Sequence, residues 1–257
     1  VSERSVAEWG NVGKLKAQWV SADSLYSRSE VPVATENKCS VDGWKGERVS
    51  AQFLLWSGTG LNGIQCKVKD FVGESGKISA GAAQARFVRY TLADEGGENC
   101  RCERGPLHPM ILAPDMLDSL KVFNMDAKTV RPVWITVDIP QNAKPGVYKS
   151  SVEVTAKGAK VTLPFELEVI DQTLPTADQW GYHLDLWQHP SAVARALNLD
   201  MWSDEHFEAL KQHMKPLAEA GQKVITTTLN RDPWGSQCFD DYESMIIWTE
   251  KVDGTWA

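Results

Sequence analysis

The sequence contains no long hydrophobic run and no block of positive charge. No segment approaches the roughly 18 consecutive apolar residues of a membrane-spanning helix, and residues 1–4 show no hydrophobic core of an export signal. The 257 residues include 27 lysines and arginines against 34 aspartates and glutamates, a net charge of −7. Without a Lys/Arg cluster, the chain lacks an electrostatic footprint for phosphate backbones. We therefore expect no membrane span and no nucleic-acid partner, with any export signal removed or never included.

Cysteine is scarce, and its spacing fits no standard site. The 5 cysteines are an odd set, and Cys100 and Cys102 are too close for a C-x-x-C redox or zinc motif. A disulfide between Cys66 and one of this pair stays open as an alternative for an exported protein. No G-x-S-x-G nucleophile elbow is present. Residues 58–63 fit G-x-G-x-x-G, but they stand between two expected strands without the helix of a dinucleotide site. We expect a glycine-rich turn there, no cofactor and no metal site.

Apolar residues recur at every second position from about residue 49 to residue 170, which is typical of strands that bury one face. The clearest runs start at Val49, Val133 and Tyr148. A connection with a glycine at residues 157–160 predicts a hairpin. Pro164 cannot donate a ladder hydrogen bond, so its strand lies at an edge or carries a bulge. Many short strands and few helices predict a mainly β fold, with an antiparallel β-sandwich over residues 1–174.

The two-residue alternation of apolar residues ends before residue 175, and a different pattern follows. Residues 180–187 are strand-like, Ser203 is typical of a helix N-cap, and apolar residues then form one helical stripe that ends at Gly221. Residues 224–229 follow as a β-branched strand of the kind that a parallel sheet covers on both faces. These elements predict that residues 175–257 begin a (β/α)₈ barrel. Such a barrel takes about 250 residues, so we expect it to be truncated and completed by a covalent continuation or a second chain.

Ligands of parallel α/β folds bind where the strands end at their carboxyl side. The predicted rim consists of Asp185, Trp187, Gln188, His189, Asn230, Asp232 and Trp234. Indole rings stack on sugar rings, while carboxylate, amide and imidazole groups hydrogen-bond to hydroxyls. The rim therefore predicts a sugar site. The alternative is that both indoles are packing residues and that Asp232 belongs to a turn.

Adjacent carboxylates occur three times, and their positions argue against catalysis. The pairs are Asp94 with Glu95, Asp204 with Glu205, and Asp240 with Asp241. The first precedes two glycines in a loop, the second lies in the first turn of the expected helix, where acidic residues meet the helix dipole favourably, and the third lies in a terminal connection. We expect no catalytic residue among them. His206 and His213, seven positions apart on that helix, are expected at its surface or flank.

Five segments, in this order, resemble one known family. They are WKGERVSAQFLLW at 44–56, PVWITVD at 132–138, AKPGVY at 143–148, HLDLWQHP at 183–190 and AGQKVIT at 220–226. Together they resemble the N-terminal part of Bacteroides-type secreted proteins grouped with the family 123 glycoside hydrolases. The resemblance covers the chain from about residue 9 onward.

The resemblance implies a β-sandwich followed by a (β/α)₈ barrel that hydrolyses β-linked N-acetylgalactosamine in glycans. In the mechanism that it implies, the 2-acetamido oxygen of the sugar attacks the anomeric carbon. An Asp positions this amide, and an adjacent Glu acts as general acid and then base. The family's Asp-Glu pair follows about the fourth barrel strand, beyond residue 257. The resemblance therefore assigns no catalytic residue here and implies a fragment that is inactive alone, with a secreted, periplasmic or outer-surface location.

A second hypothesis belongs to a different class of protein. The strand-rich part is then a non-catalytic carbohydrate-binding or assembly module, whose sheet face uses Trp44, Trp56 or Trp134. Trp134 alternates with Val133 and Ile135, so it points away from the core that these residues define. The exposure of the three indoles distinguishes this hypothesis from simple packing.

Overall fold

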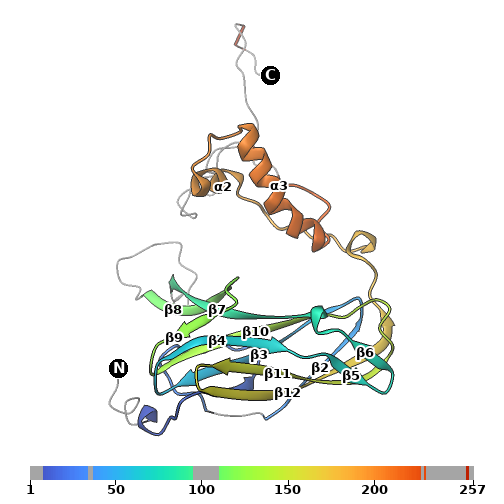
Figure 1. The fold of residues 1–257 in the computed structure, drawn as a ribbon. Coiled ribbons are helices and arrows are strands. Elements are labelled where there is room, and N and C mark those ends of the chain that lie inside the picture. Colours follow the sequence, from blue (N-terminus) through green and yellow to red (C-terminus); the bar gives the residue numbers. More distant parts are fainter. Residues whose placement is uncertain (1–7, 34–36, 95–109, 227–228, 230–252, 255–257) are drawn as a thin grey trace. The chain divides into compact units, whose positions relative to one another are not determined.

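The computed structural model describes residues 8–33, 37–94, 110–226, 229 and 253–254 (Figure 1). They fall into two units; the first ends at Leu174 and the second begins at Pro175. The first unit is built mainly of strands, with a short helical segment at residues 8–10, and the second contains helices α2 and α3. The prediction of a mainly β chain is confirmed. No helix among these residues is both long enough and apolar enough to span a bilayer.

A five-stranded sheet and a seven-stranded sheet make up the first unit. The five-stranded sheet has the order β1 (Lys16–Val20), β3 (Arg48–Ser57), β10 (Thr129–Asp138), β7 (Ala83–Asp94) and β8 (Met110–Leu117). The other has the order β2 (Cys39–Lys45), β12 (Ala159–Thr173), β11 (Gly146–Ala156), β4 (Leu61–Val68) and β9 (Phe123–Met125), with β5 (Phe71–Gly73) beside β11 and β6 (Gly76–Ile78) beside β5. A short 3₁₀ helix, Ala80–Ala82, precedes β7.

One hydrophobic core draws on both sheets. Alternate residues of β3 and β10, among them Phe53 and Ile135, are buried in the same cluster as Val152 of β11 and Phe165 of β12. These are the faces that the two-residue periodicity predicts. Trp19 of β1 joins the two sheets, because its indole Nε1 donates to the carbonyl oxygen of Pro164 at 2.7 Å.

Strand β3 is buried on both faces, which the alternation does not show. Leu54 and Trp56 point away from the main core, yet they are buried in a second cluster with Trp9 and Val130. The Nε1 of Trp9 donates to the carbonyl oxygen of Ser29 at 2.9 Å, which ties together two parts of the segment that precedes β2. This segment covers one end of the outer face of the five-stranded sheet.

The hairpin prediction is confirmed, and the purely antiparallel arrangement is wrong. β11 and β12 pair antiparallel through a two-residue turn in which Gly158 has φ +77°, a value that suits glycine. β12 pairs with β2 only from Phe165 onward, so Pro164 faces no β2 residue, as its missing N–H requires. The β2–β12 pair is parallel. Nothing local in a sequence marks which distant strand a segment pairs with, or in which direction.

The second unit has the predicted helix but not the predicted strands. Helix α3 spans Asp204–Glu219, and its N-cap Ser203 accepts a hydrogen bond from the backbone N–H of His206 at 3.2 Å. Helix α2, Pro190–Leu197, and a 3₁₀ turn, Ala177–Gln179, were not expected. Residues 180–187 and 224–226 form no strand. An extended segment becomes a strand only when a partner satisfies its backbone groups along the edge.

Acid should destabilise the first unit through Asp118. This buried carboxylate accepts hydrogen bonds from Arg89 Nη2 at 2.7 Å and from Leu120 N at 3.1 Å, and these bonds hold its pKa below the usual range. A lowered folded-state pKa contributes stability above the unfolded-state pKa of about 4, and this stability is lost as the pH falls through the folded-state value. We expect Asp118→Asn to lower the free energy of unfolding at pH 7 by about 1–2 kcal/mol.

Urea unfolding at pH 7 and pH 3 measures this effect. The difference between the wild type and Asp118→Asn should shrink at the lower pH. Asp115→Asn, an exposed carboxylate in β8, removes the same charge and should change neither value. Equal stability of wild type and Asp118→Asn at pH 7 would show that the Arg89 contact contributes nothing.

Candidate functional site

The predicted sugar-binding rim has four residues in the described part of the chain. Asp185, Trp187, Gln188 and His189 lie in the extended segment between the 3₁₀ turn and α2. Asn230, Asp232 and Trp234 lie outside the described residues. The structure therefore describes the first part of the predicted rim.

Thr226 brings Asp185 and Gln188 together. Its hydroxyl Oγ1 donates to Asp185 Oδ1 at 2.6 Å, and its backbone N–H donates to Gln188 Oε1 at 3.1 Å. The carboxylate of Asp185 lies in an exposed residue, so one oxygen is held while the group remains accessible. Thr226 lies in the β-branched run of the sequence, which gives no sign that its hydroxyl orients a carboxylate.

Gln222 also connects the segment of Asp185 with the segment of Thr226, through contacts next to those of Thr226. Its Oε1 accepts from Leu186 N at 3.1 Å, and its Nε2 donates to Leu186 O at 3.1 Å and to Val224 O at 2.8 Å. This amide bonds both backbone groups of Leu186, as a neighbouring strand would. Leu186 and Val224 are nevertheless 44% and 39% exposed, so neither is buried within the described residues.

Trp187, Gln188 and His189 also line a cleft of about 220 Å³ against α2 and α3. Trp187 is 61% exposed, which leaves an indole face available for stacking on a sugar ring. His189 has a structural role, since it is the N-cap of α2 and its Nδ1 accepts from Ala192 N at 3.2 Å. The described rim thus offers a held carboxylate, an exposed indole and a mainly apolar cleft.

His206 is fully buried, and its prediction as a surface or flank residue is wrong. Its Nδ1 accepts from Trp202 N at 2.9 Å, and its Nε2 lies 2.9 Å from the carbonyl oxygen of Pro190. Since a carbonyl only accepts, the proton is on Nε2. The ring therefore ties the start of α2 to the start of α3. Asp204 and Glu205 are exposed in the first turn of α3, as predicted.

The remaining candidates are the glycine-rich turn, the cysteines and the adjacent carboxylates, and only some of them lie in the described residues. The expected turn within residues 58–63 joins β3 and β4. Cys66 is a free thiol, so its suggested disulfide is wrong, while Cys100, Cys102 and Cys238 lie outside the described residues. In the part of the chain that the structure describes, no three His, Cys, Asp or Glu side chains gather as a metal site. Asp94 ends β7, and the carboxylates Glu95, Asp240 and Asp241 are outside the described residues.

The three indoles of the carbohydrate-module hypothesis differ in exposure. Trp56 is only 7% exposed and packs in the second cluster, so it cannot stack on a sugar. Trp44 is 41% exposed in β2. Trp134 is half-buried on the face opposite Val133, between Gln52 of β3 and Arg86 of β7. The structure thus leaves Trp44 and Trp134 as the accessible indoles of this set.

Two family models match the chain. One, the glycoside hydrolase 123 N-terminal domain, matches residues 19–156, and the other, the glycoside hydrolase 123 catalytic domain, matches residues 187–257. No protein with a curated description matches.

Among solved structures, a family 123 glycoside hydrolase from Clostridium perfringens, described for glycolipid glycan hydrolysis, is 26% identical with a TM-score of 0.85. This match covers 95% of the present chain but only 42% of that chain. A second match is an alkylpurine DNA glycosylase from Pseudomonas fluorescens, with a TM-score of only 0.28. It is 15% identical and covers 64% of this chain and 35% of that chain. The first family model alone matches more than half of the sequence, so the chain belongs to the family 123 glycoside hydrolases.

Proposed function

We propose that this chain is the N-terminal part of an exported enzyme that hydrolyses β-linked N-acetylhexosamine, of the N-acetylgalactosamine type, in glycans. The observation that carries this proposal is the match to both family 123 domains, in their order, together with the TM-score of 0.85 to a family member that acts on glycolipid glycans. In this proposal residues 1–174 form the sandwich, and residues 175–257 begin the (β/α)₈ barrel.

The proposed chemistry is substrate-assisted. The acetamido oxygen of the sugar attacks the anomeric carbon and the bond to the leaving oxygen breaks, while a carboxylic acid donates a proton to that oxygen. The same carboxylate then accepts a proton from the water that opens the cyclic intermediate. We place the Asp-Glu pair of this mechanism beyond residue 257, in line with a relative of which this chain covers only 42%. The present residues supply part of the sugar site.

The rim fits a sugar substrate in two respects. The Asp185 carboxylate accepts hydrogen bonds from hydroxyls, and Thr226 keeps it in one orientation. The exposed indole of Trp187 provides an apolar face for the ring. Gln188 has a structural part in the rim, because its amide oxygen accepts from Thr226 N and its amide nitrogen donates to the carbonyl oxygen of Leu186. Asn230, Asp232 and Trp234 are proposed to complete the rim on the next barrel segment.

The chain alone and a longer polypeptide that continues it should differ sharply in activity. We expect the longer form to release nitrophenol from nitrophenyl N-acetyl-β-galactosaminide, while residues 1–257 alone release none above the uncatalysed rate. The longer form should leave nitrophenyl β-galactoside intact, because this substrate lacks the acetamido oxygen that performs the first attack.

Each arm of the assay tests a different part of the proposal. Turnover by residues 1–257 alone would contradict a catalytic pair beyond residue 257. Equal cleavage of the galactoside would contradict substrate assistance. A longer form that binds the N-acetylgalactosaminide without cleaving it, with its fold verified by circular dichroism, would favour the non-catalytic carbohydrate-binding module.

A further inference from the structure

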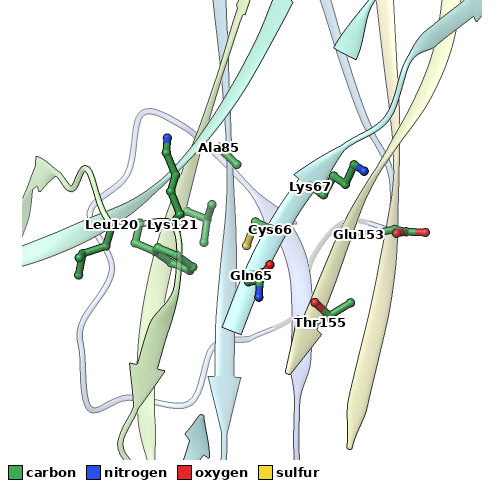
Figure 2. A pocket seen from close by; sticks show the side chains of 10 residues that line it. Gln65, Cys66, Lys67, Ala85, Leu120, Lys121, Glu153 and Thr155 are labelled. Carbon is green, nitrogen blue, oxygen red and sulfur yellow. The ribbon is translucent and has the colours of Figure 1, made fainter. Parts of the chain in front are cut away.

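The first unit contains a side cavity of about 340 Å³ that the proposed reaction does not use. It lies between β4 and β11 of one sheet and β7 and β10 of the other (Figure 2). Its volume falls within the roughly 300–1,000 Å³ of small-molecule sites. Its lining residues are Gln65, Cys66, Lys67, Ala85, Phe87, Leu120, Lys121, Val133, Glu153 and Thr155.

The inner wall of the side cavity is apolar and uncharged. Phe87 and Val133 belong to the main core, and Ala85 and Cys66 pack against it. Burial raises the pKa of the Cys66 thiol to about 12, so this group is protonated and neutral at physiological pH. The inner wall therefore has no charged group that could neutralise the charge of a ligand.

The rim of the side cavity carries more positive than negative charge, although Glu153 lies opposite Lys67 in the β4–β11 pair. Lys67 and Lys121 are exposed and form no ion pair with any residue that the structure describes. Glu153 is the acidic residue of the lining, and both its oxygens are occupied, by Lys69 at 2.9 Å and Lys160 at 3.0 Å. In Figure 2 Lys67 and Lys121 lie on opposite sides of Cys66. This arrangement contrasts with the net charge of −7 of the whole chain.

The segment that carries Leu120 and Lys121 is anchored. Asp118 bonds Arg89 Nη2 at 2.7 Å and accepts from Leu120 N at 3.1 Å. The negative charge nearest to this segment is thereby neutralised by Arg89. Near Lys67, Asp70 is likewise bonded to Lys77 Nζ at 2.6 Å and to Ala80 N at 2.8 Å. Both unpaired lysines thus remain available to an incoming anion.

We propose that the side cavity binds an anionic monosaccharide, a hexose carrying one carboxylate or sulfate group. Its ring lies against Phe87 and Leu120, and its charge lies at Lys67 and Lys121. The sugar class rests on the proposed function of the chain, whereas the preference for an anion rests on the rim. The site holds a charged residue of a glycan and belongs to the first unit, whereas the predicted rim belongs to the second.

Calorimetric titration of the 257-residue chain with charged and neutral sugars tests this inference. The probes are N-acetylgalactosamine 6-sulfate and glucuronic acid, with neutral N-acetylgalactosamine and inorganic sulfate as comparisons. We expect one or both anionic sugars to bind about tenfold or more tightly than either comparison, and their affinity to fall as salt is added. Amide resonances of residues 65–67 and 87 should shift on binding.

Lysine variants locate the site. Lys67→Gln with Lys121→Gln should weaken binding of the anionic sugar by about tenfold. Lys16→Gln with Lys144→Gln removes the same charge at exposed positions elsewhere in the first unit and should leave it unchanged. Thermal melting verifies that both double variants fold.

Three results would overturn the inference: equal binding of the neutral sugar, equal binding of inorganic sulfate, or equal loss in both double variants. No hydrolysis is measured, so these outcomes are independent of whether the longer enzyme cleaves N-acetylgalactosaminides. Failure of the enzymatic assay with retained anion-selective binding would separate the two proposals.

Discussion

Replacing Trp19 with alanine is expected to lower the free energy of unfolding of the first unit by about 3–5 kcal/mol, the usual cost of deleting a large buried aromatic side chain. Trp19 is 1% exposed, and its ring lies 5.4 Å from that of Phe53 and 5.1 Å from that of Phe165. The substitution also removes the donor to Pro164 O, a carbonyl of the opposite sheet. Urea unfolding followed by circular dichroism measures the loss.

Trp19→Phe separates the contribution of ring packing from that of the hydrogen bond to Pro164 O. It keeps most of the apolar volume but removes the indole N–H, so it should cost about 1–3 kcal/mol. Trp44→Ala is the matched control, because this indole is 41% exposed in β2 and should cost less than either change. If Trp19→Phe and Trp19→Ala proved equally destabilising, the hydrogen bond to Pro164, rather than packing, would dominate.

In the proposed longer enzyme, Asp185→Ala is expected to lower kcat/KM for the N-acetylgalactosaminide by about 10- to 100-fold, since hydrogen bonds to charged groups contribute roughly 1.5–3 kcal/mol. Thr226→Val should lower it less, because the carboxylate remains but loses the hydroxyl that orients it at 2.6 Å. Steady-state kinetics with both variants measures the two effects.

Asp200→Asn provides the comparison for charge alone. Asp200 is exposed in the same unit, in the connection between α2 and α3, and its replacement should leave kcat/KM unchanged. A wild-type value in Asp185→Ala would remove Asp185 from the sugar site. A Thr226→Val effect as large as that of Asp185→Ala would mean that orientation of the carboxylate accounts for its whole contribution.

The strands of the main core could be predicted because their periodicity reports one buried face. Val133, Ile135 and Val137 are core residues, and the hairpin turns at Gly158 as expected. Burial of Leu54 and Trp56 could not be predicted in this way, since it depends on a second layer supplied by a segment far away in the sequence. Periodicity identifies a face that is buried, but not whether the opposite face is covered.

The rim was only partly predictable. Its role as a sugar site stays a prediction, and the segment 180–187 that contains Asp185 and Trp187 is extended but is not a strand. Gln222 and Thr226 make the contacts that hold the rim, and neither type of residue signals such a role by its spacing. Burial of His206 could not be predicted, because histidine tolerates both water and burial. Its burial here depends on two backbone partners, at Pro190 and Trp202, that only the fold brings together.

The parallel pairing of β2 with β12 has a consequence for synthesis. β2 is made early, and in its sheet it pairs only with β12, the last strand of the first unit. At roughly 5–20 residues per second, β2 is without its partner for on the order of 10 s. Such distant pairing also slows folding of the finished chain. During this interval the edge of β2 is open to pairing with other nascent chains, so the yield of correctly folded protein should depend on translation speed and on chaperones.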